Sequence, residues 1–249
     1  MGAGPNYADS GWWQGLVALL ALALSQLPPV RLWFKRPKLD LVAFEKIVLT
    51  EDVGLPGVQL HINITNSGGR EVRINKIALL LKRQDDPTRE LIGRGYFEKA
   101  SDPQAVLLTP FQLKPKEEWG HVVNFFNYRT REDQKAYAAA VSDLKRNIIN
   151  KRANLPKDHP DVEADADIVL RLQQMFDASF YWRSGEYSVE LLVETDAAKA
   201  NVKNTYRITL FESDSEALYS HRNELKTGHG VMVRGPQVEP LLVDLRRDH

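Results

Sequence analysis

The chain has 249 residues, of which 27% are charged and 43% are hydrophobic, the balance of a folded globular chain rather than a disordered one. Its 33 basic and 33 acidic residues cancel, so no overall positive field draws it to nucleic acid, and we predict no nucleic-acid partner. Cysteine is absent, which excludes disulfides, thiolate metal sites and cysteine nucleophiles.

Residues 10–30 carry no charged side chain, and this run is the strongest signal of location in the sequence. A helix needs about 20 residues to cross a hydrocarbon layer of about 30 Å, so the run has the length of a membrane anchor, although Pro28-Pro29 would end or kink the helix. Aliphatic residues cover every face of the expected helix, and aromatic residues typical of membrane interfaces flank it. The residues expected to form and bracket the anchor are Trp12, Trp13, Leu16, Leu20, Leu24, Trp33 and Phe34.

Basic residues follow the apolar run at once, whereas residues 1–14 contain neither Lys nor Arg. Positive charge beside a membrane span stays on the cytoplasmic side. We therefore predict a protein of the cell membrane with a single span, its N-terminus outside and its remaining domain in the cytoplasm. The cations expected to fix this orientation and to contact lipid are Arg31, Lys35, Arg36 and Lys38.

Two other interpretations of the apolar run stay open. Ala23-Leu24-Ser25 resembles a signal-peptide cleavage site, in which case the mature domain would be exported to the periplasm or cell surface. The run is also short enough to be an apolar helix that docks on the following domain. If the run is a membrane anchor, residues 1–38 form the anchor with its basic flank, and residues 39–249 form one domain.

Alternating apolar and polar residues predict strands through most of that domain. The clearest strand is residues 58–65, where Val58, Leu60, Ile62 and Ile64 share one face. Similar patterns predict strands at residues 39–51, after the turn "NSGG" and, more weakly, around residues 91–97, 105–108 and 111–128. Strand patterns return at residues 185–195 and 205–213, followed by a short helix that ends at Gly228 and a tail with no secure assignment.

A helical hairpin interrupts the strands at about residues 130–180. Thr130 and Asp133 have the spacing of a capping box, which predicts a helix from Arg131 to about Asn150 with Leu144 on its buried face. Residues 162–180 predict a second helix with acidic residues in its first turn. Strands on both sides of a helical hairpin predict a mainly β domain, an antiparallel sandwich with a helical insertion.

Three segments carry a resemblance to a known family. The strand and turn patterns of immunoglobulin-like β-sandwich domains are similar to those of "HINITNSGGREVRINKIAL", "FQLKPKEEW" and "WRSGEYSVELLVE". The resemblance implies two antiparallel sheets packed face to face, without the cysteine pair of antibody domains. It implies no activity, because this architecture carries many unrelated functions.

No catalytic, cofactor or metal motif occurs, so we predict no cofactor, no catalytic residue and no metal ligand. His61 and His121 would approach each other if their strands paired, but isolated strand histidines are more often surface residues or hydrogen-bonded. Glu163, Asp165 and Asp167 lack the glycine and final glutamate of a calcium loop. An enzyme whose site assembles only in the fold remains an alternative.

The densest basic cluster lies at the end of the first predicted helix and in the loop after it. A tethered domain would hold such a cluster near anionic headgroups, or would present it to an acidic partner. We predict a membrane-anchored accessory or scaffold protein whose cytoplasmic domain binds a protein partner through edge strands or through the helical insertion. The expected contact residues are Lys145, Arg146, Lys151, Arg152 and Lys157.

Overall fold

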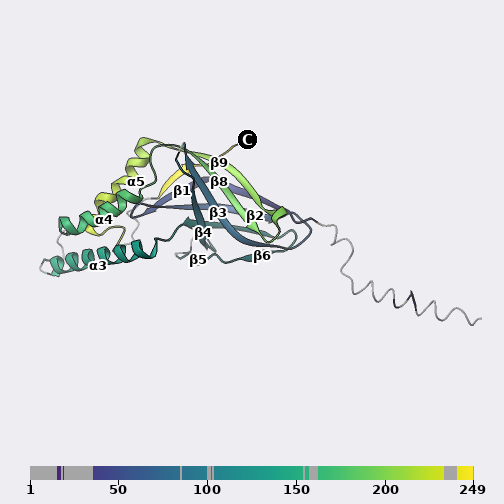
Figure 1. Cartoon of the computed structure of the whole chain (residues 1–249), viewed down its shortest axis with the longest axis horizontal. Coiled ribbons are helices and arrows are strands. Elements are labelled where there is room, and N and C mark those ends of the chain that lie inside the picture. Colours follow the sequence, from purple (N-terminus) through teal and green to yellow (C-terminus); the bar gives the residue numbers. More distant parts are fainter. Residues whose placement is uncertain are drawn as a thin grey trace, which may run out of the picture.

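The computed structural model describes residues 16, 17, 19, 36–84, 86–99, 102, 104–153, 155–156, 162–232 and 240–248 (Figure 1). The strands of this part form one antiparallel sheet in the order β10-β1-β2-β7-β4-β3-β8-β9-β11, while β5 pairs with β4 and β6 pairs with β3. Strand bounds are β1 Leu39–Asp52, β2 Leu55–Asn66, β3 Val72–Arg83, β4 Arg89–Phe97, β5 Val106–Leu107, β6 Phe111–Leu113, β7 Glu118–Phe126, β8 Gly185–Thr195, β9 Val202–Leu210, β10 Leu241–Asp244 and β11 Arg246–Arg247.

The prediction of an immunoglobulin-like sandwich is wrong. Every described strand belongs to the same hydrogen-bonded sheet, which curls into a nearly closed, barrel-like shape, whereas a sandwich needs two separate sheets packed face to face. The mainly β, antiparallel character is as predicted. The error arises because alternation tells which residues face a core but not which strands pair.

The C-terminal segment draws the two edges of the sheet together. β10 pairs with β1, with Val243 opposite Ile47, and β11 pairs with β9 after one intervening residue, Leu245. The backbone N–H of Leu245 donates to the carbonyl of Glu45 at 2.8 Å. Asn204 on β9 also donates to the carbonyl of Leu41 on β1 at 2.7 Å. One short segment thus connects both edges of the sheet.

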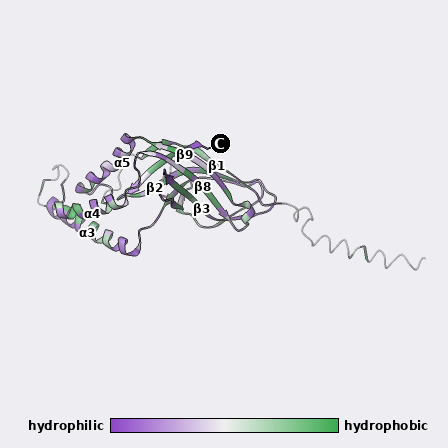
Figure 2. Cartoon of the chain, turned by 45° about the horizontal axis from the view of Figure 1, so that its top comes forward, coloured by the Kyte–Doolittle hydropathy of each residue, from purple (hydrophilic) through white to green (hydrophobic). Residues whose placement is uncertain are grey.

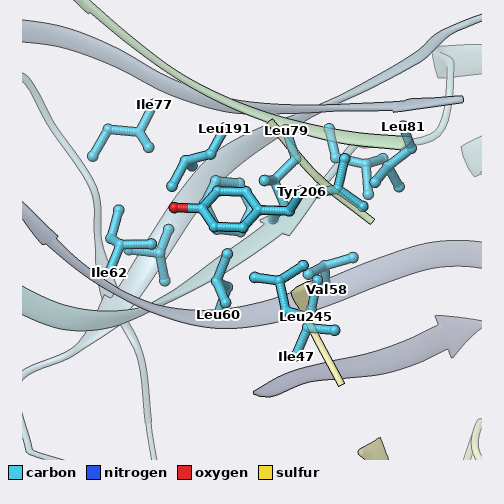
Figure 3. Close-up of a cluster of buried hydrophobic side chains, with 14 of the residues drawn as sticks. Ile47, Val58, Leu60, Ile62, Ile77, Leu79, Leu81, Leu191, Tyr206 and Leu245 are labelled. Atoms are coloured by element: carbon cyan, nitrogen blue, oxygen red, sulfur yellow. The ribbon is translucent and has the colours of Figure 1, made fainter. Parts of the chain in front are cut away.

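The inward side chains of this curled sheet form the main core. Figure 3 shows Leu60 from β2, Leu191 from β8 and Tyr206 from β9 pointing toward one another, with Leu245 from the closing segment beside them. The predicted alternation of β2 is confirmed, since Val58, Leu60, Ile62 and Ile64 are all buried. Burial of apolar surface at about 25 cal/mol per Å² makes this interior the main source of stability.

The helices gather at one end of the sheet, as Figures 1 and 2 show. The hairpin predicted at residues 130–180 is present, and the helix bounds are α3 Arg131–Ala153, α4 Ala166–Ser179, α5 Glu212–Glu224, with 3₁₀ turns η2 Ala198–Ala200 and η3 Leu225–Thr227. The capping interaction is confirmed, because the backbone N–H of Asp133 donates to Thr130 Oγ1 at 3.1 Å. Leu144 of α3, Leu172 of α4 and Leu225 of η3 meet in a second, smaller core.

The helix α4 buries one face against the second core. The helix buries Val169, Leu172 and Phe176, whereas Ile168 and Met175 are only partly buried. At its end, Trp182 is fully buried and its indole Nε1–H donates to the carbonyl of Thr50 on β1 at 2.8 Å. This bond ties the helical end of the molecule to the sheet.

The predicted anchor falls almost entirely outside the described residues. Only its Leu16 is described, together with Val17 and Leu19, and all three are exposed. Within the described part of the chain, none of the helices combines the length and the apolar character that a membrane span requires. The residues of the predicted anchor that lie outside the described part of the chain are Trp12, Trp13, Leu20, Leu24, Trp33 and Phe34, and the same holds for the predicted flanking cations Arg31 and Lys35.

Candidate functional site

A cavity of about 550 Å³ lies where the β1–β2 hairpin meets α5 and the residues that follow it. This volume is within the range of small-molecule sites. Apolar side chains supply part of the wall, and the ionisable side chains come from the strand end on one side and from the helix on the other. The residues that line the cavity include Glu51, Val53, Phe125, His221, Glu224 and His229.

The hairpin turn that borders the cavity is strained. Val53 has φ +46° and Gly54 has φ +83°, so both central residues of the turn are left-handed. Glycine accepts this backbone freely, and a Cβ at Gly54 would lie 2.3 Å from the carbonyl oxygen of Phe176. Valine does not accept it, because its branched Cβ clashes there. Val53 is nevertheless buried in the second core, which holds the turn in this conformation.

Glu51 and His221 both line the cavity and form a largely buried pair. His221 Nδ1 lies 3.2 Å from Glu51 Oε1, and their side chains are 12% and 7% exposed. The other oxygen of Glu51 accepts a hydrogen bond from the backbone N–H of Gly54 at 2.6 Å. Both oxygens of Glu51 are thus occupied, since a carboxylate only accepts and Nδ1 must carry the proton toward it.

Glu224 is placed differently from Glu51. One of its carboxylate oxygens, Oε2, is buried and has no hydrogen-bond partner among the described residues. An unpaired polar atom in such a position costs free energy, about 1 to 3 kcal/mol for a neutral group and more for a charged one. Glu224 therefore offers an acceptor that the protein itself leaves unused.

The other polar groups near Glu224 are satisfied within the chain. Thr227 Oγ1 donates to the carbonyl of Glu224 at 2.9 Å and lies 2.9 Å from His229 Nδ1, from which it accepts. The proton of this hydroxyl is committed to a backbone carbonyl, so Thr227 is not arranged as a nucleophile with His229 as its base.

The charge of the cavity is negative. Glu51, Asp52 and Glu224 line it, and none of the described lining residues is Lys or Arg. Asp52 is neutralised from outside by Arg129, whose Nη1 lies 2.7 Å from its Oδ2. Glu51 has its histidine partner, so Glu224 is the lining carboxylate without an ion-pair partner among the described residues.

An ion pair fixes the helix that carries His221 and Glu224. Arg222 on α5 donates to Asp177 on α4 at 2.7 and 2.9 Å, and Tyr219 donates to the same carboxylate at 2.9 Å. Arg222 in the first place, and Tyr219 to a smaller extent, hold the pKa of Asp177 below its usual value against the effect of burial. The hydrogen bond that Tyr219 donates to Asp177 raises the pKa of Tyr219.

The structure separates the histidines that the sequence suggested as a pair. His61 is exposed on the outer face, whereas His121 lies opposite the inward-facing Ile62 and packs within 4.8 Å of the Tyr96 and Trp119 ring centroids. Facing residues in an antiparallel pair share one face, so the two histidines lie on opposite faces. No group of three or more His, Asp or Glu residues suited to a metal ion occurs within the described ranges.

The predicted basic cluster is only partly free. Lys151 pairs with Asp165 at 2.6 Å, and Arg146 reaches Asp143 at 3.9 Å. Lys145 and Arg152 are exposed and form no ion pair within the part of the chain described, and Lys157 lies outside it. Of the predicted flanking cations, Arg36 is exposed and Lys38 pairs with Asp40 at 3.2 Å.

The sequence offered one overlooked signal for the cavity. His221 and Glu224 are three residues apart on a predicted helix, so they share a face, just before the helix-ending Gly228. Glu51 is 170 positions from His221, and nothing local connects them. Neither a model of a known protein family nor a curated protein matches the chain.

Proposed function

We propose that this chain is a binding protein held at the cell membrane by its N-terminal segment, and that the helical end of its domain binds an acidic segment of a protein partner. The observation that carries the proposal is an exposed stripe on α3, made of Lys145, Ile149 and Arg152. We call it the α3 stripe. Residues spaced by four and three positions lie above one another on a helix, so these three side chains form one surface.

The composition of the α3 stripe favours an acidic partner with an apolar residue. Ile149 is 59% exposed between two exposed cations, while an adjacent face of the helix buries Ala140, Leu144 and Ile148. Lys151 is already occupied by Asp165. A partner that supplies carboxylates to Lys145 and Arg152 would gain charge pairing and cover Ile149 at once.

The position of the α3 stripe favours a protein over lipid. β1 has 14 residues and carries the chain about 40 Å, from Leu39 to the turn beside the helices, at about 3.3 Å per residue. Figure 1 shows α3 extending outward from the end of the sheet at which the helices gather. An anchor before Leu39 therefore leaves the α3 stripe at the far end of the domain, which weakens the expectation that the basic cluster touches the same membrane.

A photo-crosslinking residue at position 149 of the full-length chain tests this proposal. We expect crosslinks to a protein segment rich in Asp and Glu, identified by mass spectrometry. The double variant Lys145→Glu with Arg152→Glu should abolish them, because it turns attraction into repulsion. The matched control is Arg131→Glu with Lys135→Glu, which changes the same charge at the other, equally exposed end of α3.

Two outcomes would count against the proposal. Crosslinks that go only to lipid would favour headgroup binding, and crosslinks that persist after charge reversal would show that the α3 stripe is not the contact. Position 107 on β5, where the leucine is 66% exposed, serves as a control site for crosslinking to random neighbours.

The membrane location is tested separately. We expect the C-terminus to be cytoplasmic, so a reporter that works only in the cytoplasm should be active when it is fused after His249. Alkaline phosphatase activity there, or a mature N-terminus near Gln26, would favour the exported alternative instead.

A further inference from the structure

We propose that the cavity beside the β1–β2 hairpin binds a small organic cation, a protonated amine attached to an apolar or aromatic body. This site is separate from the α3 stripe and from any partner bound there. It is carried by three independent features of the same cavity: its shape, its uncompensated carboxylate and its strained wall.

The charge of the cavity selects a cation. Its described lining holds three carboxylates and no Lys or Arg. Glu51 is paired with His221, and Asp52 is paired with Arg129, which lies outside the cavity. Glu224 is therefore the lining carboxylate that is left to pair with a ligand. Glu224 lines the cavity and its Oε2 has no hydrogen-bond partner among the described residues, so a bound cation would bring a donor to this carboxylate.

The chemistry of the walls selects an organic cation rather than a metal ion. A divalent metal needs several oxygen or nitrogen ligands at short range, and the described residues hold no such group. Leu55 and Phe126, which are only partly buried, line the cavity instead, and they suit a hydrocarbon or aromatic body. An ammonium group also gains from the face of an aromatic ring such as that of Phe126.

The strain at Val53 belongs to the same cavity. A buried valine at φ +46° costs stability, and residues in sparsely populated backbone regions cluster at binding sites, where the surrounding structure holds them in place. Val53 lines the cavity between Glu51, which is bonded to the turn, and Leu55. The turn therefore fixes the position of the Glu51–His221 pair, leaving the ligand to complete Glu224.

Titration of the full-length protein with three indoles tests the proposal. Tryptamine carries an ammonium, 3-ethylindole is neutral and indole-3-propionate is an anion of similar size; spermidine tests for an amine without a ring. By isothermal titration calorimetry, we expect saturable binding of tryptamine that is at least about tenfold tighter than that of either other indole, the effect of one charge-assisted hydrogen bond.

Glu224→Gln separates binding from folding. It removes the charge but keeps the shape, so tryptamine binding should weaken at least about tenfold. The variant should melt no lower than the parent chain, because an unpaired buried charge has been removed. Glu224→Asp should bind with intermediate affinity. Glu216→Gln, on the exposed face of the same helix, is the matched control and should bind as the parent does.

The outcomes are decisive in both directions. Tryptamine selectivity that disappears in Glu224→Gln and survives in Glu216→Gln supports the proposal. It is overturned if neither tryptamine nor spermidine binds saturably, if indole-3-propionate binds as tightly as tryptamine, or if Glu224→Gln leaves the affinity unchanged.

Discussion

Asp177 on α4 accepts two hydrogen bonds from the guanidinium of Arg222 on α5, at 2.7 and 2.9 Å. These are the most direct polar connection between the helical hairpin and the helix that lines the cavity. The hydrogen bonds lower the pKa of Asp177. A lowered pKa in the folded state makes the stability of this contact depend on pH.

Asp177→Asn should destabilise the protein at neutral pH but not in acid. Because its folded pKa is depressed, Asp177 stabilises the fold above its unfolded pKa of about 3.9, and this contribution is lost as the pH falls through the folded pKa. We expect a loss of about 1 kcal/mol at pH 7, modest because the carboxylate is partly exposed. Thermal melts of both chains should begin to converge below about pH 4 and should coincide once the pH is below the folded pKa of Asp177. A gap that stays constant with pH would contradict this account.

Val53→Gly should be more stable than Val53→Ala. At most buried sites glycine is worse than alanine, because it loses more backbone freedom on folding. At φ +46° the order reverses, since alanine keeps the clash that glycine removes. We expect a difference of about 1 kcal/mol in the free energy of unfolding, measured by urea denaturation. The ordinary order would show that the turn is not strained. Val58→Gly and Val58→Ala are the control pair.

Leu245→Ala should weaken the closure of the sheet. Leu245 is 5% exposed in the main core between β10 and β11, whereas Leu242 in the same segment is 58% exposed. We expect Leu245→Ala to cost about 3 kcal/mol and Leu242→Ala less than about 0.5 kcal/mol in the free energy of unfolding. Equal effects from the two substitutions would show that the segment does not close the sheet as described.

Trp182→Phe should loosen the helical end from the sheet. The substitution leaves the Thr50 carbonyl without its donor and leaves a void where Trp182 is fully buried. A cost of about 2 to 3 kcal/mol is expected from the two effects together. Denaturation followed by circular dichroism measures it, with Trp119→Phe at a half-buried site as the comparison. A loss no larger than that of Trp119→Phe would show that the bond to Thr50 contributes little.

The helices and strands were accessible from local pattern. The alternation of residues 58–65 marked β2, the Thr130–Asp133 spacing marked the start of α3, and Gly228 marked the end of the helical segment after β9. Each signal lies within a few residues of the feature that it predicts. The closing strands β10 and β11 were not predicted, because four- and two-residue strands are too short for a periodic pattern.

Local pattern could not separate a sandwich from a nearly closed sheet. Both bury the same alternate residues, and they differ in the pairing of distant segments, such as Lys46 with Asp244. The same holds for the cavity. Glu51 and His221 are 170 residues apart, and only the docking of α5 against the β1–β2 hairpin brings them together.

The sequence by itself determined the longer strands, the mainly β class, the helical hairpin and the absence of cysteine chemistry, because these depend on composition and on neighbours along the chain. Only the tertiary structure decided the single curled sheet, its closure through Leu245, and the cavity lined by Glu224, whose Oε2 has no hydrogen-bond partner among the described residues. These depend on contacts between segments far apart in the sequence. The free energy of such a contact depends on both segments together, so neither segment alone predicts it.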